Sequence, residues 1–110
     1  MEINVKTVDQ ATVVEIIGDI DGKTASQVQE VILPLVQPDS KILLDMSQVG
    51  YMSSAGLRLL LSTYRQVTSQ KASIILVGVN EDIQDTMSAT GFLRFFTLHD
   101  TVEAGLETFS

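Results

Sequence analysis

The fold is decided by residues 41–61, which read KILLDMSQVGYMSSAGLRLLL. Ile42–Leu44 is short, apolar and followed by polar residues, a pattern typical of a central strand covered on both faces. After a short loop, a helix begins near Ser53. Backbone N–H groups in the first turn of a helix lack intrahelical acceptors and carry partial positive charge. Ser53 and Ser54 therefore stand where a phosphate group would be tolerated.

The helix that begins near Ser53 is amphipathic. At about 100° per residue, its apolar side chains form one stripe that we expect to face the sheet. This stripe contains Leu57, Leu60, Leu61, Tyr64 and Val67. Arg58 and Arg65 are expected on the solvent side. Leu59 lies about 200° from Leu57, so we expect it to be exposed and to contact a partner, the alternative being an exposed leucine without a role.

The preceding residues predict a β-hairpin and a helix. Residues 2–8 alternate polar and apolar side chains, Thr12–Ile17 is rich in β-branched residues, and residues 9–10 form the turn between them. Thr24 is a candidate N-cap for the helix, and Pro34 is expected to end or kink it. The apolar positions of this helix are Val28, Val31 and Ile32.

The following residues predict two further strands that alternate with two helices. We place the strands at Ala72–Val77 and Phe95–Leu98. Asn80 is expected to cap a helix that ends at Gly91. Asp100 with a glutamate three residues later forms a capping-box-like pair before the last helix. The apolar stripe of that helix consists of Val102, Leu106 and Phe109. Strands that alternate with helices predict an α/β fold with parallel pairings later in the chain.

Composition excludes several function classes. With 110 residues, 45% of them hydrophobic, the chain has the size and apolar content of one domain. The absence of cysteine and the presence of one histidine exclude disulfides and ordinary zinc sites. The net charge of −7 disfavours nucleic acid and favours a partner with a basic surface. No apolar run is long enough to span a bilayer and the N-terminus lacks a secretion signal, so we expect a cytoplasmic protein with no membrane partner.

Motifs for catalysis are absent from the sequence. The chain has neither a Gly-x-Ser-x-Gly elbow nor a glycine-rich phosphate-binding motif. His99 precedes a predicted helix cap and is interpreted as a surface loop residue. We therefore expect no catalytic residue, no metal and no cofactor.

Three segments resemble the STAS family, in particular the small bacterial anti-sigma factor antagonists. In that family a strand leads through a Leu-Asp-Leu-Ser pattern and a short loop to Asp-Ser-Ser/Thr-Gly-Leu at a helix start, which is similar to Leu44–Leu57. Gly18–Ala25 is similar to the family segment Gly-x-Leu-Asp-x-x-Thr-Ala. Thr90–Phe96 resembles the family's Ser-Gly-Leu and the apolar strand after it.

The resemblance implies a STAS fold over one domain, residues 1–110. This fold has a single mixed sheet of four to five strands with an N-terminal hairpin, and about four helices packed mainly on one face. In members of this family the first hydroxyl after the Asp is phosphorylated, and counting back two residues from Gly56 places that hydroxyl at Ser54. Ser53 stands where the family usually has Asp and is the second candidate.

The resemblance also implies a function, that of an anti-sigma factor antagonist. Unphosphorylated, such a protein binds an anti-sigma factor that is also a serine kinase and thereby releases a sigma factor; a serine phosphatase restores the binding form. We expect a monomer, with a weak dimer as the alternative. The expected partner-binding residues are Asp21, Thr24, Ser53, Ser54, Gly56, Arg58 and Leu59.

Two alternatives remain open at this point. The first is a STAS scaffold or a subunit of a sensory complex that is not phosphorylated. The second concerns Asp21, which contacts the partner or forms an Asx-turn before Gly22. Asp45 is interpreted as structural, bonding backbone amides after the strand.

Overall fold

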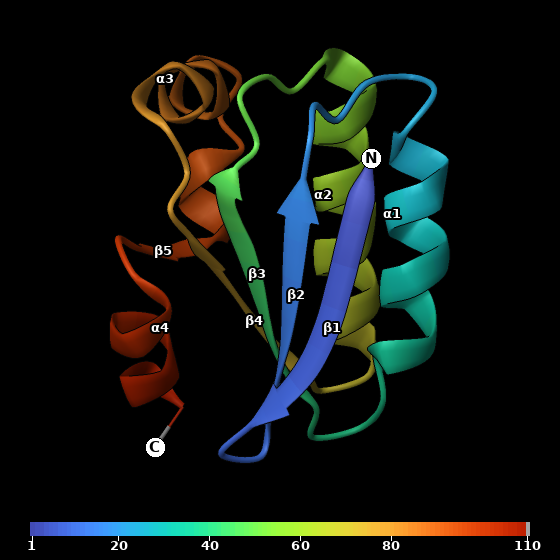
Figure 1. Ribbon diagram of the computed structural model, residues 1–110, viewed down its shortest axis with the longest axis vertical. Coiled ribbons are helices and arrows are strands. Elements are labelled where there is room, and N and C mark those ends of the chain that lie inside the picture. The colour runs from blue at the N-terminus through green and yellow to red at the C-terminus, as the bar shows by residue number, and fades with distance from the viewer. Residues whose placement is uncertain (110) are drawn as a thin grey trace.

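The computed structural model describes residues 1–109, in which strands and helices alternate as Figure 1 shows. The strands are β1 (Glu2–Val8), β2 (Ala11–Ile17), β3 (Lys41–Gln48), β4 (Ser73–Val77) and β5 (Thr97–His99). The α-helices are α1 (Ala25–Ile32), α2 (Ser54–Ser69), α3 (Glu81–Ala89) and α4 (Val102–Thr108), and the 3-10 helices are η1 (Leu33–Leu35) and η2 (Leu93–Phe95). Pro34 lies in η1, where α1 ends, as predicted.

The five strands form one mixed sheet in the order β1-β2-β3-β4-β5. β1 and β2 are antiparallel, and the other neighbours are parallel. Asp9 and Gln10 connect the hairpin with φ values of 50° and 70°. Positive φ at both central residues is typical of a type I′ turn, whose twist matches that of the strands. The mixed sheet and the N-terminal hairpin confirm the predicted α/β fold.

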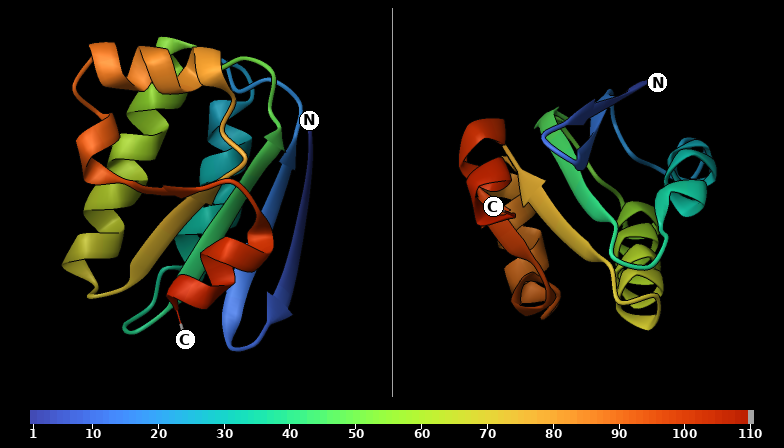
Figure 2. Two further views of the ribbon diagram at one scale, coloured as in Figure 1. Left: turned by 90° about the vertical axis from the view of Figure 1, so that its left-hand side faces the viewer. Right: turned by 90° about the horizontal axis from the view of Figure 1, so that it is seen from below.

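The sheet is covered on both faces, but unequally, as the two views in Figure 2 show. The larger core lies under α1, α2 and α3, and the smaller one under α4. The prediction of helices mainly on one face is confirmed. β3 contributes to both cores, with Ile42 and Leu44 in the larger and Leu43 in the smaller. Among residues 1–109, no helix combines the length and apolar character needed to cross a lipid bilayer.

Helix α2 buries a different arc from the predicted stripe. Its buried residues are Gly56, Leu57, Leu59, Leu60, Thr63 and Val67. Leu59 is only 5% exposed, so the prediction that it is exposed was wrong. Because α1 packs against α2 beside the sheet, the helix is covered from two directions. Thr63 can be buried on this side because its hydroxyl donates to the Leu59 carbonyl at 2.9 Å. Arg58 and Arg65 are exposed, as predicted.

The C-terminal elements differ in detail from the predictions. Phe95 ends η2, and Phe95 and Phe96 pack against Tyr64 of α2 with ring centroids 5.3 and 5.6 Å apart. This aromatic packing moves the start of β5 to Thr97. The N-cap of α4 is Thr101, whose hydroxyl accepts the Ala104 N–H at 3.1 Å, so the prediction of Asp100 as the cap was wrong.

Candidate functional site

The loops that follow β2 and β3 are hydrogen-bonded to one another. The Ile20 N–H donates to the Tyr51 carbonyl at 3.0 Å, and the Ser53 N–H donates to the Ile20 carbonyl at 2.9 Å. Ile20 and Met52 thus form an isolated parallel bridge beyond the ends of the strands. We call residues 18–24 and 49–53 the paired loops. Their bonding brings the two segments predicted to carry function side by side.

The adjacent serines at the start of α2 differ in environment. Ser53 is the N-cap, with extended backbone, and its hydroxyl oxygen accepts the Gly56 N–H at 3.5 Å. Its side chain is half-buried. Ser54 is the first residue of α2 and is exposed. Within residues 1–109 the Ser54 hydroxyl makes no hydrogen bond, so it is the freer of the two groups.

Gly56 allows α2 to approach the paired loops closely. It is buried, and a Cβ at this position would collide with the Met52 side chain and lie 3.1 Å from the Ile20 carbonyl oxygen. Because that oxygen is part of the backbone, it cannot move aside as the end of a side chain would. Gly56 therefore acts from inside the domain and lies out of reach of a partner, contrary to the prediction.

Asp21 and Thr24 hold the first of the paired loops together. The Asp21 carboxylate accepts the Lys23 and Thr24 N–H groups at 2.9 and 3.1 Å, which forms the Asx-turn considered for this residue. These backbone hydrogen bonds, the one from Lys23 first, lower the pKa of Asp21. Thr24 occupies the N-cap position of α1, as predicted, but its side chain makes no capping hydrogen bond. The Thr24 hydroxyl instead donates to the Asp19 carbonyl at 2.8 Å and accepts the Asp21 N–H at 2.9 Å.

Asn80 ties α3 to the same loops, a role that the sequence did not reveal. Its side-chain oxygen accepts the Ile83 N–H at 2.8 Å and caps α3, as predicted. Its amide nitrogen donates to the Val49 and Gly50 carbonyls at 3.3 and 3.2 Å. Carbonyl acceptors that lie far away in the chain leave no local signal, so the sequence pattern indicated only the cap.

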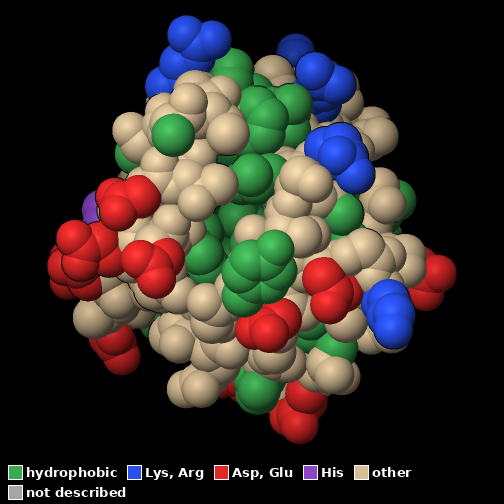
Figure 3. Space-filling model, turned by 90° about the horizontal axis from the view of Figure 1, so that it is seen from above, with side chains coloured by type: hydrophobic (Ala, Val, Ile, Leu, Met, Phe, Trp, Pro, Cys, Tyr) green, Lys and Arg blue, Asp and Glu red, His purple; other side chains and the backbone are tan. Residues whose placement is uncertain are grey.

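Tyr51 is the most exposed large hydrophobic residue of residues 1–109, at 56%. It lies in the paired loops, three residues before Ser54. Figure 3, which views this end of the molecule, shows hydrophobic side chains running down the middle of the face, with acidic side chains beside its lower part. A partly exposed aromatic ring is a common anchor in protein interfaces. Sequence analysis missed Tyr51, although an aromatic residue in a loop before a helix is a usable signal.

Asp45 and His99 have structural contacts. Asp45 accepts the Ser47 N–H at 3.1 Å and the Ser47 hydroxyl at 2.7 Å, in agreement with its predicted structural role. His99 is the last residue of β5 and half-buried, not a surface loop residue as predicted. One of its ring nitrogens, Nε2, lies 2.8 Å from the Thr108 hydroxyl.

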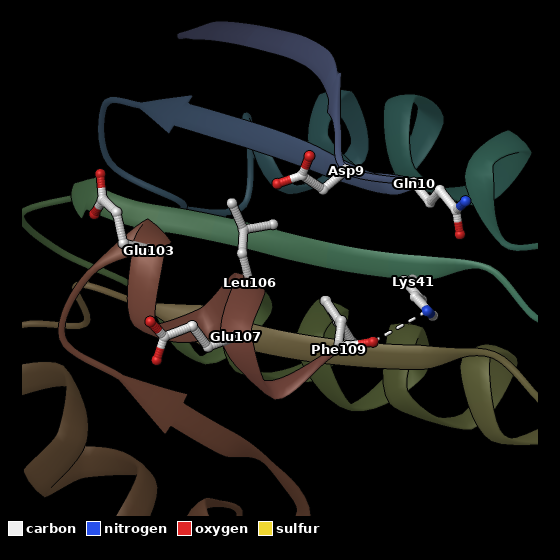
Figure 4. Close-up of a pocket in the computed structure, with 7 residues that line it drawn as sticks. All are labelled: Asp9, Gln10, Lys41, Glu103, Leu106, Glu107 and Phe109. Atoms are coloured by element: carbon white, nitrogen blue, oxygen red, sulfur yellow. Dashed lines mark hydrogen bonds between the residues drawn. The ribbon is translucent and has the colours of Figure 1, made fainter.

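A hollow lies at the other end of the sheet, as a close-up shows (Figure 4). Its volume is about 460 Å³, and Asp9, Gln10, Lys41, Glu103, Leu106, Glu107 and Phe109 line it. Lys41 donates to the Phe109 carbonyl at 3.1 Å across it. Lys41 begins β3 and Ser54 follows its far end, roughly 25 Å away along the strand. The hollow is therefore separate from the paired loops. Nowhere in residues 1–109 do three or more metal-ligating side chains group to hold a metal ion.

Three kinds of comparison with known proteins give matches that cover nearly the whole chain. The STAS domain model matches residues 2–105. The anti-sigma-B factor antagonist of Bacillus subtilis is 25% identical over 107 residues, 97% of this chain and 98% of that protein. An anti-sigma factor antagonist from Mycobacterium paratuberculosis is 25% identical with a TM-score of 0.84, covering 97% and 92% of the two chains. The Bacillus cell fate determinant SpoIIAA, in its phosphorylated form, gives a TM-score of 0.74 at 16% identity, covering 99% and 100%.

Proposed function

The chain belongs to the STAS domain family, and we propose that it is an anti-sigma factor antagonist controlled by phosphorylation at Ser54. In its unmodified form it binds an anti-sigma factor that is also a serine kinase, and so frees a sigma factor. The kinase transfers a phosphate to Ser54 and the complex dissociates. A serine phosphatase restores the binding form. The chain acts as a single domain in the cytoplasm and catalyses no reaction itself.

The observation that carries this proposal is the exposure of Ser54 at the start of α2. A kinase must reach the hydroxyl it modifies, and this hydroxyl has no hydrogen-bond partner to give up within residues 1–109. Ser53 is half-buried and its oxygen already accepts the Gly56 N–H. We therefore assign the modification to Ser54, with Ser53 as the second candidate.

The phosphorylated domain is expected to keep its fold. A phosphate adds about −1.5 to −2 charge and three acceptor oxygens. At the first residue of α2 it lies beside backbone N–H groups that have no intrahelical acceptor and at the positive end of the helix dipole, which stabilise an anion there. The change in charge thus acts on what docks at this surface and leaves the domain intact.

The effect on a partner is large enough for a switch. An unpaired charge placed in a desolvated interface costs roughly 2–5 kcal/mol. This corresponds to a loss of affinity of about 30-fold to several thousand-fold. A complex with a Kd of about 1 nM would therefore have a Kd between about 30 nM and several micromolar after phosphorylation.

The proposed contact surface consists of the paired loops and the exposed side of the first turns of α2. Its residues are Asp21, Thr24, Tyr51, Ser53, Ser54 and Arg58. Gly56 and Leu59 are buried beneath this surface and shape it from inside. The net charge of −7 favours a partner whose docking surface is basic.

Binding of the cognate anti-sigma factor, measured by isothermal titration calorimetry, tests this function. Ser54→Ala should bind like the unmodified protein and keep binding after incubation with the kinase and ATP. Ser54→Asp should bind at least about 30-fold more weakly. Ser69→Asp, which adds the same charge at the other end of α2, is the control and should bind normally.

Two outcomes would count against the proposal. The first is equal affinity of the wild type and Ser54→Asp. The second is the failure of the kinase and ATP to label Ser53 or Ser54, as located by mass spectrometry. The second outcome would favour the alternative of an unphosphorylated scaffold or sensory-complex subunit. This alternative is worth testing because position 53 has a serine where the family usually has an aspartate.

A further inference from the structure

Strand β1 has an open outer edge. It is the first strand in the sheet order, and no strand of residues 1–109 pairs with its outer side. It is seven residues long, contains no proline, and pairs with β2 without a break in register. Such an edge presents unpaired backbone N–H and C=O groups to solvent. β5, at the opposite edge, has only three residues.

The hairpin turn determines which residues direct these groups outward. The type I′ turn closes on Val8 and Ala11, which therefore form a hydrogen-bonded pair. Hydrogen-bonded and non-hydrogen-bonded pairs alternate along an antiparallel ladder. It follows that Ile3, Val5 and Thr7 direct their backbone N–H and C=O groups away from β2.

Two of the outward-directed residues, Ile3 and Val5, also carry apolar side chains. Ile3 is half-buried against the larger core, whereas Val5 is 46% exposed. Among the large hydrophobic side chains of residues 1–109, only Tyr51 is more exposed than Val5. An added strand would cover Val5 and pair the free backbone groups at the same time.

We propose that β1 pairs with β1 of a second copy of the chain, antiparallel and with Asn4 opposite Asn4. This register places Ile3 opposite Val5 of the second copy at hydrogen-bonded positions. It places Glu2 opposite Lys6 at non-hydrogen-bonded positions, where side chains come closest. By symmetry, each of these pairs occurs twice.

Charge selects this register over its neighbours. Shifting the centre to Val5 places Glu2 opposite Val8 and Lys6 opposite Asn4, so no opposite charges meet. Shifting it to Lys6 places two lysines opposite each other, which is destabilising. The centre at Asn4 is the one in which all charged side chains of β1 have opposite partners. β1 itself is neutral, so the rest of the chain supplies the net charge of −7 and keeps the dimer weak.

Sedimentation equilibrium of the full chain over a range of concentrations tests this dimer, at physiological salt so that repulsion between the two net charges is screened. The average mass should rise from 12.0 kDa towards twice that value. Lys6→Glu should weaken the dimer at least about tenfold, because two attractive pairs become repulsive. The double variant Glu2→Lys/Lys6→Glu should restore it. Lys71→Glu makes the same change of net charge at an exposed turn and should behave like the wild type.

A proline variant tests the backbone pairing separately. Val5→Pro removes an outward N–H and leaves the hydrogen bonds to β2 in place, so the chain should fold but no longer dimerise. Circular dichroism verifies the fold. A wild type that stays monomeric at its highest soluble concentration would overturn the proposal. So would equal effects of Lys6→Glu and Lys71→Glu, or a double variant that fails to recover.

Discussion

The first turns of α2 have a buried side, which packs against the rest of the domain, and an exposed side, which faces solvent. On the buried side, Gly56 and Leu59 pack against the paired loops and the larger core. On the exposed side, Ser54 and Arg58 face solvent. Packing on the buried side fixes where α2 begins, and the side chains of Ser54 and Arg58 do not contribute to that packing. A modification on the exposed side can therefore change binding without disturbing the structure that positions it.

The largest expected effect comes from truncating Leu59 on the buried side. Leu59→Ala should lower the free energy of unfolding by about 3 kcal/mol, because it removes a buried side chain and leaves a cavity. Arg58→Ala, one residue away and exposed, should change it by less than about 0.5 kcal/mol. Urea denaturation measures both. Equal losses of unfolding free energy for Leu59→Ala and Arg58→Ala would contradict the burial of one side of α2 and the exposure of the other.

The next effect tests the close approach at Gly56. Gly56→Val should destabilise the domain by about 2 kcal/mol, since its side chain would collide with Met52 and the Ile20 carbonyl. A Cβ at Gly22 would meet no heavy atom within 4 Å, so Gly22→Val serves as the control with an effect below about 0.5 kcal/mol. Thermal unfolding at neutral pH compares the two. A tolerated Gly56→Val would contradict the packing of α2 on the paired loops.

A smaller effect separates the two serines. Ser53→Ala should cost about 1 kcal/mol, the usual value for the loss of an N-cap. Ser54→Ala removes a hydroxyl without a hydrogen bond in residues 1–109 and should leave the unfolding midpoint in urea unchanged. The reverse order would mean that Ser54 supports the helix start, and that its modification would disturb the fold.

The smallest effect concerns the pH dependence of stability due to Asp21. Its pKa in the folded chain lies below the ordinary value of 3.8 because backbone N–H groups donate to the carboxylate. The resulting stabilisation is present above about pH 4 and is lost as the pH falls through the folded pKa. Asp21→Asn removes this contribution, so the wild type should lose stability relative to it between about pH 5 and pH 2. Urea denaturation at a series of pH values measures this difference. Equal pH dependence of the unfolding free energy in the wild type and Asp21→Asn would contradict a lowered pKa of Asp21.

Much of the fold is readable from local patterns. The hairpin, the central strand with Ile42–Leu44, and the helix starts after the N-caps Ser53 and Asn80 follow from alternation, apolar runs and capping residues. These signals are local because the hydrogen bonds that create them lie within a few residues. The same holds for the ending of α1 at Pro34.

The sequence-based predictions fail where parts of the chain that are distant in sequence pack against one another. The prediction of an exposed Leu59 rests on its angle from Leu57, and it fails because the burial of Gly56 and Thr63 widens the covered arc of α2. Tertiary packing on Tyr64 displaced the last strand. The second role of Asn80 depends on carbonyls across the fold. For the candidate site, the sequence placed the two serines at a helix start and Asp21 in a loop before a helix, but it did not indicate the exposure of Tyr51.

The bridge between Ile20 and Met52 has a consequence for any enzyme that acts at Ser54. The two halves of the paired loops come from distant parts of the chain and meet only after folding. A short peptide around Ser54 lacks one of these halves, and a misfolded copy of the chain contains both but does not pair them. Recognition of both halves would therefore restrict signalling to intact molecules, so that damaged copies would be ignored.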